Sequence, residues 1–153
     1  MRSVRLSSIV TREILHPADA QGVANVYYNR YLVSLGKLQA DVGTDIQADP
    51  TAQYARDTDS PPSAGAPWWA DLADAGGNVH PNNPYNTYTH PGLPPGPIAA
   101  APWNVIEAAA YPNPSGPSPY FYFLSDSCGA THYATTNDEF NQLKSKYLAT
   151  GKC

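Results

Sequence analysis

A glutamate in the first segment of the chain lies where a charged residue is not expected. Residues 4–15 have the periodicity of a helix, and at about 100° per residue Leu6, Ile9 and Val10 define its apolar face. Glu13 falls on that face, within about 20° of its centre. A carboxyl held against apolar walls has a raised pKa, as a general acid near neutral pH requires. Glu13 is therefore a candidate catalytic acid. The alternatives are partial exposure at the helix end or an ion pair with an arginine.

A second helix is expected from about residue 19 to residue 35, with Gly36 as its left-handed cap. Its inward face carries Arg30 together with Val23, Val26, Tyr27, Tyr31 and Ser34. Each of the two consecutive helices therefore places one charged residue on its inner face, and the two charges have opposite signs. One interpretation is a buried ion pair between Glu13 and Arg30. The other is that Arg30 orders a site by holding a carboxylate or a sugar oxygen.

Length and composition favour one domain over residues 1–153 with long ordered loops. Charged residues make up 14% of the chain, and 16 Pro and 11 Gly interrupt it. The net charge of −4 argues against nucleic acid as the main partner. No apolar run is long enough for a membrane segment, and the start of the chain does not read as a signal peptide. Because the first helix begins almost at Met1, we expect a domain cut from a longer protein.

The remaining elements predict an α+β fold, with helices around a small antiparallel hairpin and long ordered loops. Residues 37–102 are expected to be mostly irregular, with a short helical turn at 68–72. Residues 103–110 read as a helix. The aromatic run 120–124 reads as a strand that pairs with residues 131–134. Thr136 and Glu139 have capping-box spacing and begin a last helix.

The cysteines and histidines indicate no metal site, and nothing in the sequence predicts a cofactor. Cys128 and Cys153 lack the spacing of metal ligands, and no histidine pair lies near them in the sequence. A disulfide between them and two free thiols are both compatible with the sequence. His132 lies in the expected second strand and is interpreted as structural.

Five motifs occur in an order typical of one family. They are SSIVTRE at 7–13, YNR at 28–30, IQADPTAQY at 46–54, YNTY at 85–88 with GLPPGPI at 92–98, and the segment 120–132. In these motifs the chain resembles the catalytic domain of endolytic murein transglycosylases of the MltG (YceG-like) type. The resemblance covers nearly the whole chain.

The resemblance implies a lytic transglycosylase that acts on peptidoglycan glycan strands. It implies cleavage of the β-1,4 bond between N-acetylmuramic acid and N-acetylglucosamine, with 1,6-anhydro ends as products. Glu13 would serve as both general acid and general base. The substrate-binding residues expected from the matched motifs are Asn29, Arg30, Gln47, Asp49, Thr51, Tyr85, Asn86, Thr87 and Tyr88. Within the YNTY motif Asn86 is the strongest candidate for a substrate contact, while the two tyrosines could equally be core residues.

The resemblance also implies a place in the cell envelope, where the family is membrane-anchored. The sequence neither supports nor excludes docking on cell-wall synthases. The chain departs from the family at Thr11, which replaces a glutamate, and at residues 100–102, which replace a turn. Insertions before Ile46 and in the loop at 60–67 could reshape the groove.

Two other functions compete with this interpretation. Asp49 could be the second carboxylate of a hydrolytic muramidase, or a turn residue whose side chain accepts backbone N–H bonds. The chain could also be a non-catalytic peptidoglycan-binding module. Glu13 argues against that second alternative, because a binding module has no need of a costly buried acid.

Overall fold

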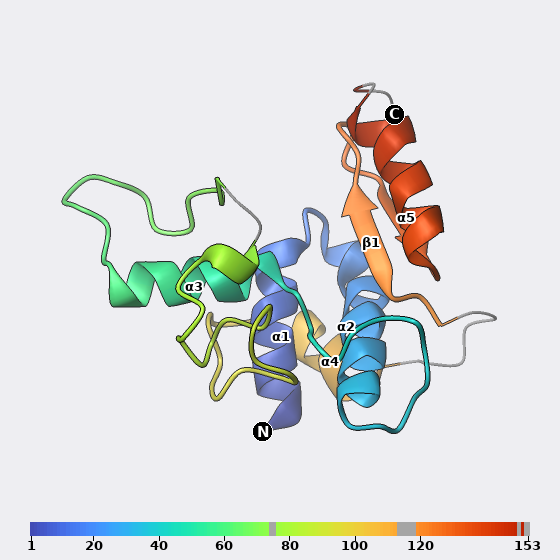
Figure 1. Cartoon of the computed structure of the whole chain (residues 1–153), viewed down its shortest axis with the longest axis horizontal. Coiled ribbons are helices and arrows are strands. Elements are labelled where there is room, and N and C mark those ends of the chain that lie inside the picture. The colour runs from blue at the N-terminus through green and yellow to red at the C-terminus, as the bar shows by residue number, and fades with distance from the viewer. Residues whose placement is uncertain (74–75, 113–118, 150, 152–153) are drawn as a thin grey trace.

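The computed structural model describes residues 1–73, 76–112, 119–149 and 151. Helices α1 (Arg2–Glu13), α2 (Ala20–Ser34) and α4 (Trp103–Ala110) lie together at the centre of the molecule (Figure 1). Helix α3 (Asp49–Asp59) projects to one side of this centre. The hairpin of β1 (Tyr122–Ser125) and β2 (Thr131–Ala134) lies over α2 with α5 (Asn137–Leu143) beside it. The predicted α+β fold class is confirmed.

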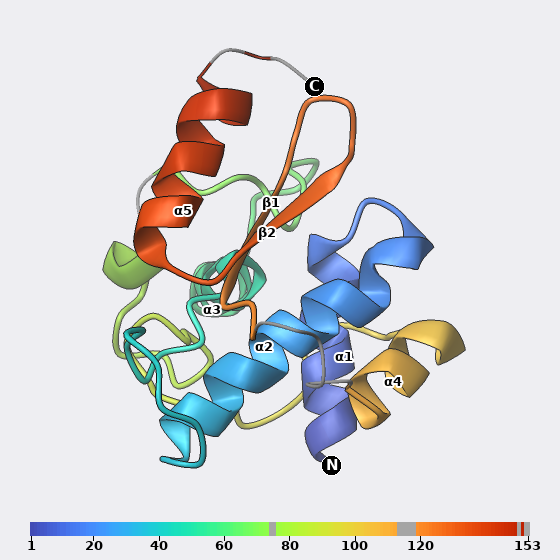
Figure 2. The same ribbon diagram turned by 90° about the vertical axis from the view of Figure 1, so that its right-hand side faces the viewer.

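Helix α1 buries the face that its sequence predicts. Leu6, Ile9 and Val10 are completely buried, and α1 packs against both α2 and α4 (Figure 2). The helix ends at Glu13, because Ile14 already has an extended backbone and His16 precedes a proline. This ending leaves Glu13 in the last turn of a helix whose preceding turns are fixed by the core.

Helix α2 ends at the predicted glycine. Gly36 has a φ of +66°, and its N–H donates to the carbonyl of Val33 over 2.9 Å. The N–H of Lys37 donates to the carbonyl of Leu32 over 2.8 Å, which completes a hydrogen-bonded helix end. Helix α2 contributes Val23, Ala24 and Tyr27 to the core, where α4 meets it with Val105, Ala108 and Ala109. The predicted bounds of α4 are confirmed.

The prediction that residues 37–102 are mostly irregular misses helix α3. Pro50 occupies its first turn, where the missing N–H is not needed, and Ala52 and Ala55 are buried. An Asp-Pro-Thr sequence suits a turn as well as a helix start, so local signals did not separate the two. The expected helical turn at 68–72 is also wrong: only Trp68 and Trp69 form a turn, and Trp69 has a φ of +67°.

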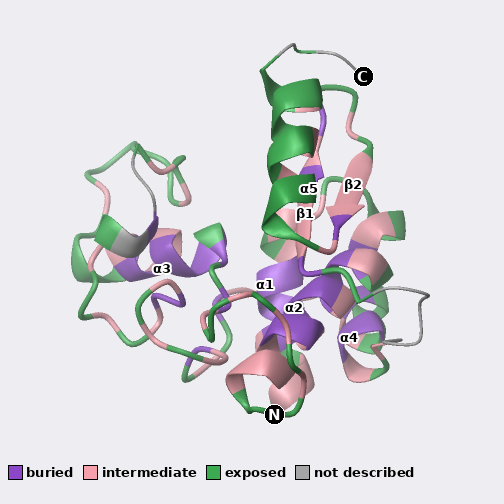
Figure 3. Cartoon of the chain, turned by 45° about the vertical axis from the view of Figure 1, so that its right-hand side comes forward, coloured by how far each residue is buried: buried purple, intermediate pink, exposed green. Residues whose placement is uncertain are grey.

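The hairpin pairs its strands antiparallel, with Tyr122 opposite Ala134 and Ser125 opposite Thr131. The first strand begins two residues later than predicted. Thr136 accepts a hydrogen bond from the N–H of Glu139 over 3.2 Å, and Glu139 accepts one from the N–H of Thr136, so the predicted capping box is present. Helix α5 continues into a π-helical turn at Lys144–Leu148 and is exposed on its outer side (Figure 3).

A carboxylate fixes the tip of the hairpin. Asp126 accepts hydrogen bonds from the N–H groups of Cys128 and Ala130, each over 2.9 Å, and contacts Nε2 of His132 at 2.7 Å. Cys128 is disulfide-bonded, and Cys153, with which the sequence could pair it, lies outside the described residues. Among the helices of the described ranges, none is both long and apolar enough to cross a membrane.

Candidate functional site

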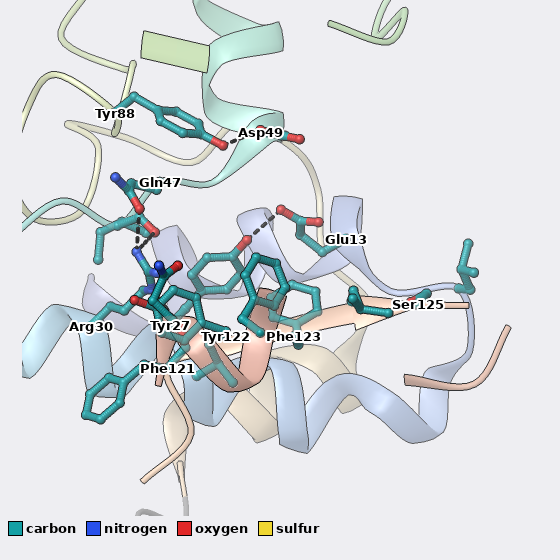
Figure 4. Close-up of a pocket in the computed structure, with 16 residues that line it drawn as sticks. Glu13, Tyr27, Arg30, Gln47, Asp49, Tyr88, Phe121, Tyr122, Phe123 and Ser125 are labelled. Atoms are coloured by element: carbon teal, nitrogen blue, oxygen red, sulfur yellow. Dashed lines mark hydrogen bonds between the residues drawn. The ribbon is translucent and has the colours of Figure 1, made fainter. Parts of the chain in front are cut away.

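A cleft of about 480 Å³ opens between the helices and the hairpin (Figure 4). Glu13 from α1 and Tyr27 and Arg30 from α2 lie on one side, and Gln47, Asp49 and Tyr88 lie on another. Strand β1 and the residue before it border the cleft from Phe121 to Ser125, and Phe121, Tyr122 and Phe123 are aromatic. The cleft therefore combines one wall of rings with a set of ionisable and amide groups.

Glu13 is half-buried at the end of α1, and its carboxyl points into this cleft. The hydroxyl of Tyr27 donates a hydrogen bond to Glu13 Oε1 over 2.5 Å. Burial raises the pKa of Glu13 to about 7; the Tyr27 hydrogen bond opposes this rise, and the negative charge of Asp49 adds to it. Near neutral pH the carboxyl is thus present in both its protonated and its ionised form.

Arg30 does not pair with Glu13; the ion pairs found in the described ranges involve other residues. Its Nε donates to the carbonyl of Phe121 over 2.7 Å. Its Nη1 donates to the carbonyls of Asp45 and Ile46 and to Oε1 of Gln47, over 3.1, 3.3 and 3.0 Å. The ion-pair interpretation is therefore wrong. Arg30 joins α2 to the segment before α3 and to the start of the hairpin.

Gln47 lies at the rim in a conformation that L residues rarely adopt. Its φ is +56°, and its N–H donates to the carbonyl of Thr87 over 3.0 Å. The side-chain oxygen of Gln47 accepts a hydrogen bond from Arg30. The residue is exposed, but this bond holds the oxygen of its amide group towards the interior. Strained backbone of this kind clusters at ligand sites, and here the surrounding hydrogen bonds maintain it.

Asp49 and Tyr88 form a pair on the same rim. The hydroxyl of Tyr88 donates to Oδ1 of Asp49. One of the two interpretations of the sequence had backbone N–H groups as the donors to this side chain. Burial raises the pKa of the Tyr88 hydroxyl, and Asp49 raises it further. The tyrosine therefore keeps its proton and remains a hydrogen-bond donor throughout the neutral pH range.

Asn86, which the sequence predicts to contact substrate, is completely buried below this rim and does not line the cleft. Its amide nitrogen donates to the carbonyls of Gly76 and Val79, over 2.8 and 2.6 Å. Its amide oxygen accepts from the N–H of Tyr88 over 2.9 Å. Because both ends of the amide are occupied, Asn86 shapes the loop that presents Tyr88.

Four further residues of the predicted set also lie away from the cleft. The hydroxyls of Thr51 and Thr87 are 2.7 Å apart and buried, and both contact the backbone of Ala48. Asn29 is buried and donates to the carbonyl of Tyr120 over 3.0 Å. The ring of Tyr85 packs on that of Tyr54, with centroids 4.8 Å apart. In these positions the four side chains hold neighbouring segments of the chain in place and do not line the cleft.

The structure thus brings together Glu13, Arg30, Gln47, Asp49 and Tyr88 from the predicted set. Sequence reasoning missed the contact between Tyr27 and Glu13. Tyr27 was recognised only as part of an apolar helix face, and its approach to Glu13 depends on how α1 and α2 pack. Within the described residues, no cluster of three His, Cys, Asp or Glu side chains could hold a metal ion.

Comparison with known proteins identifies relatives for nearly the whole chain. The model of the YceG-like family matches residues 1–146. A curated relative, the endolytic murein transglycosylase of Bacillus subtilis (strain 168), is 32% identical over 145 residues, which are 95% of this chain and 34% of that protein. A crystal structure of a putative yceG-like protein from Listeria monocytogenes has 34% identity and a TM-score of 0.63, over 91% of this chain and 38% of that one.

The chain spans about a third of the length of these two relatives. The matched region includes the core helices α1, α2 and α4, and it also includes every residue that lines the cleft. On the match of residues 1–146 and the identity to the curated relative, this chain belongs to the YceG-like family.

Proposed function

We propose that this chain is a lytic transglycosylase. It cleaves the β-1,4 bond between N-acetylmuramic acid and N-acetylglucosamine in peptidoglycan glycan strands and leaves 1,6-anhydro ends. The observation that carries this proposal is the carboxyl of Glu13, which faces the cleft with a pKa of about 7. The name of the Bacillus subtilis relative, an endolytic murein transglycosylase, supports the substrate class. Because such strands lie outside the cytoplasmic membrane, we place the activity there.

Glu13 acts first as an acid. Its protonated carboxyl gives a proton to the glycosidic oxygen while the bond from that oxygen to C1 breaks, and positive charge develops at C1. The ionised carboxyl then accepts the proton of the C6 hydroxyl of the same muramic acid. The oxygen of that hydroxyl bonds to C1 and closes the anhydro ring, and Glu13 returns to its protonated form.

A pKa near 7 suits both steps. A carboxyl with an ordinary pKa of 4.5 would be almost fully ionised at neutral pH and could not supply the first proton. The nucleophile belongs to the substrate, so proximity replaces an activated water and no second catalytic carboxylate is needed. Asp49 then contributes its charge, which favours the protonated form of Glu13.

The other cleft residues offer groups that suit a glycan. Aromatic rings suit stacking on pyranose faces, and Phe140 from α5, whose ring stacks on that of Tyr122, lies on the same cleft. The exposed amide of Gln47 and the hydroxyl of Tyr88 are placed to bond with acetamido or hydroxyl groups. The five buried or packed residues of the original prediction are left out of this proposed binding surface.

Mass spectrometry of the products from purified peptidoglycan tests the proposal. Anhydro-muramyl fragments, lighter by one water than their reducing counterparts, are the expected products. Reducing-end fragments would instead support a hydrolytic muramidase, for which Asp49 in the same cleft is the available second carboxylate. Release of neither kind of fragment, with glycan binding retained, would contradict both reactions and favour a binding module.

A further inference from the structure

We propose that Tyr27 is a positioning residue, whose hydroxyl holds Oε1 of Glu13 so that Oε2 is the oxygen that carries the transferred proton. Neither the motifs nor the family membership assign a role to this tyrosine. The inference rests on the function proposed above, because it concerns the acid of that reaction. Its hydrogen-bond part can be tested without any substrate.

The position of the Tyr27 hydroxyl is fixed from two sides. Tyr27 is buried in the middle of α2 and only 3% exposed. Its ring meets the ring of Phe123 from β1 edge to face, at 5.6 Å and 85°. A ring confined in this way cannot swing its hydroxyl away from Glu13. The hairpin therefore orients the carboxyl through Tyr27, although it donates no hydrogen bond to Glu13 itself.

The hydrogen bond makes the two oxygens of Glu13 different. A phenol has one proton, and in Tyr27 it is directed at Oε1 over 2.5 Å. Burial and the nearby carboxyl raise the pKa of Tyr27 well above its ordinary value, so the hydroxyl keeps this proton. When Glu13 is protonated, its own proton belongs on Oε2. One donor thus selects the oxygen that acts on the glycan.

Tyr27 also limits how far burial raises the pKa of Glu13. Burial and Asp49 from α3 favour the protonated form, whereas the Tyr27 hydrogen bond favours the ionised form. The other titratable side chains that line this cleft are Arg30 from α2, Tyr88 from the loop before α4 and Tyr122 from β1. Arg30, Tyr88 and Tyr122 all remain in place when only the Tyr27 hydroxyl is removed.

Carbon-13 NMR of the glutamate side chains tests the hydrogen bond directly. The chain contains three glutamates, Glu13, Glu107 and Glu139, so a labelled sample gives few carboxyl signals, and Glu13→Gln identifies the relevant one. Tyr27→Phe removes a single oxygen atom. We expect it to raise the titration midpoint of Glu13 by roughly one pKa unit. An unchanged midpoint would overturn the inference.

Tyr28→Phe is the matched control. Tyr28 is the next residue of α2, and its hydroxyl accepts a 3.5 Å contact from Arg2, away from the cleft. Its variant should leave the midpoint of Glu13 unchanged; an equal shift in both variants would overturn the assignment to Tyr27. In the unaltered protein, the hydrogen bond to Glu13 should make the Tyr27 hydroxyl proton exchange slowly with water. Rapid exchange of that proton would contradict the inference.

The pH dependence of glycan cleavage tests the positioning role. Because the first step needs protonated Glu13, the rate falls above its pKa. In Tyr27→Phe this fall should move to higher pH by the same amount as the NMR midpoint, while the maximal rate drops several-fold because the carboxyl is less well oriented. A profile identical to the wild type would overturn the inference. Absence of anhydro products from the wild type would instead overturn the proposed function, whatever the titration shows.

Discussion

The guanidinium of Arg30 donates a hydrogen bond to the side-chain oxygen of Gln47 over 3.0 Å, and so ties helix α2 to the rim of the cleft. The same guanidinium also holds the carbonyl of Phe121 at the start of the hairpin, over 2.7 Å. One buried side chain thus fixes two walls of the cleft relative to each other. Its planar, forked shape makes this possible, because a guanidinium can donate in several directions at once.

Replacement of Arg30 by lysine should therefore destabilise the fold. A single ammonium cannot reach both Phe121 and the segment at 45–47, so the carbonyl of Phe121 or those of Asp45 and Ile46 would lose their donor. We expect a loss of about 2–4 kcal/mol in the free energy of unfolding, measured with urea. Arg12→Lys, at an exposed site, should change it by less than about 1 kcal/mol. Equal effects of the two changes would contradict this account of Arg30.

Asn86→Asp should likewise act on stability. The change removes the two donors that serve Gly76 and Val79 and places a carboxylate beside their carbonyls, at a completely buried position. We expect a loss of about 2–3 kcal/mol in urea unfolding. The exposed Asn82 provides a matched control for the same substitution. A stable Asn86→Asp protein that has lost glycan binding would show that the residue contacts substrate after all.

The raised pKa of Glu13 makes stability depend on pH. In the unfolded chain this carboxyl ionises near 4.5, whereas in the folded protein it does so near 7. The folded state thus binds the proton more tightly, and stability falls as pH rises from about 4.5 to 7. Glu13→Gln should be more stable than the wild type at pH 8, by about 1–3 kcal/mol, and equally stable at pH 4.

Urea unfolding at the two pH values measures this difference. Glu107→Gln is the control, because Glu107 lies exposed on α4 and its replacement should give no pH-dependent gain. A Glu13→Gln protein with the same stability as the wild type at both pH values would contradict the burial of the acid.

Asp49→Asn should lower the pH at which Glu13 titrates, whereas Tyr27→Phe should raise it. The charge of Asp49 raises the pKa of Glu13, so its removal makes ionisation easier. NMR titration would show the lower midpoint, and Asp41→Asn, at an exposed loop position, should not. The variant should still release anhydro products, because the proposed reaction uses only one carboxylate. Loss of all cleavage would favour Asp49 as a second catalytic group.

Local patterns sufficed for the parts of the fold that local interactions determine. The apolar face of α1, the glycine end of α2 and the capping box of α5 each depend on residues a few positions apart. Helix α3 was not predicted, because its first residues are as typical of a turn as of a helix and it contains few large apolar residues. It is stabilised by contacts with α1, which no local window contains.

The site could be predicted only in part for the same reason. The helical wheel identified Glu13 as an unusual acid, but it could not show that Tyr27, fourteen residues later, reaches Oε1. Short polar residues such as Asn86 and Thr87 are typical of ligand contacts in a loop. Here they are buried and hydrogen-bonded within the protein, and that distinction depends on the packing of distant segments.

Comparison of wild type and Glu13→Gln on purified peptidoglycan tests the central claim most directly. Folding of the variant is checked first by its NMR spectrum, and the released fragments are then quantified by mass spectrometry. The account predicts anhydro-muramyl fragments from the wild type and a loss of roughly 10²-fold or more in the variant, as expected when a general acid is removed. Release of the same fragments at the wild-type rate by Glu13→Gln would contradict it.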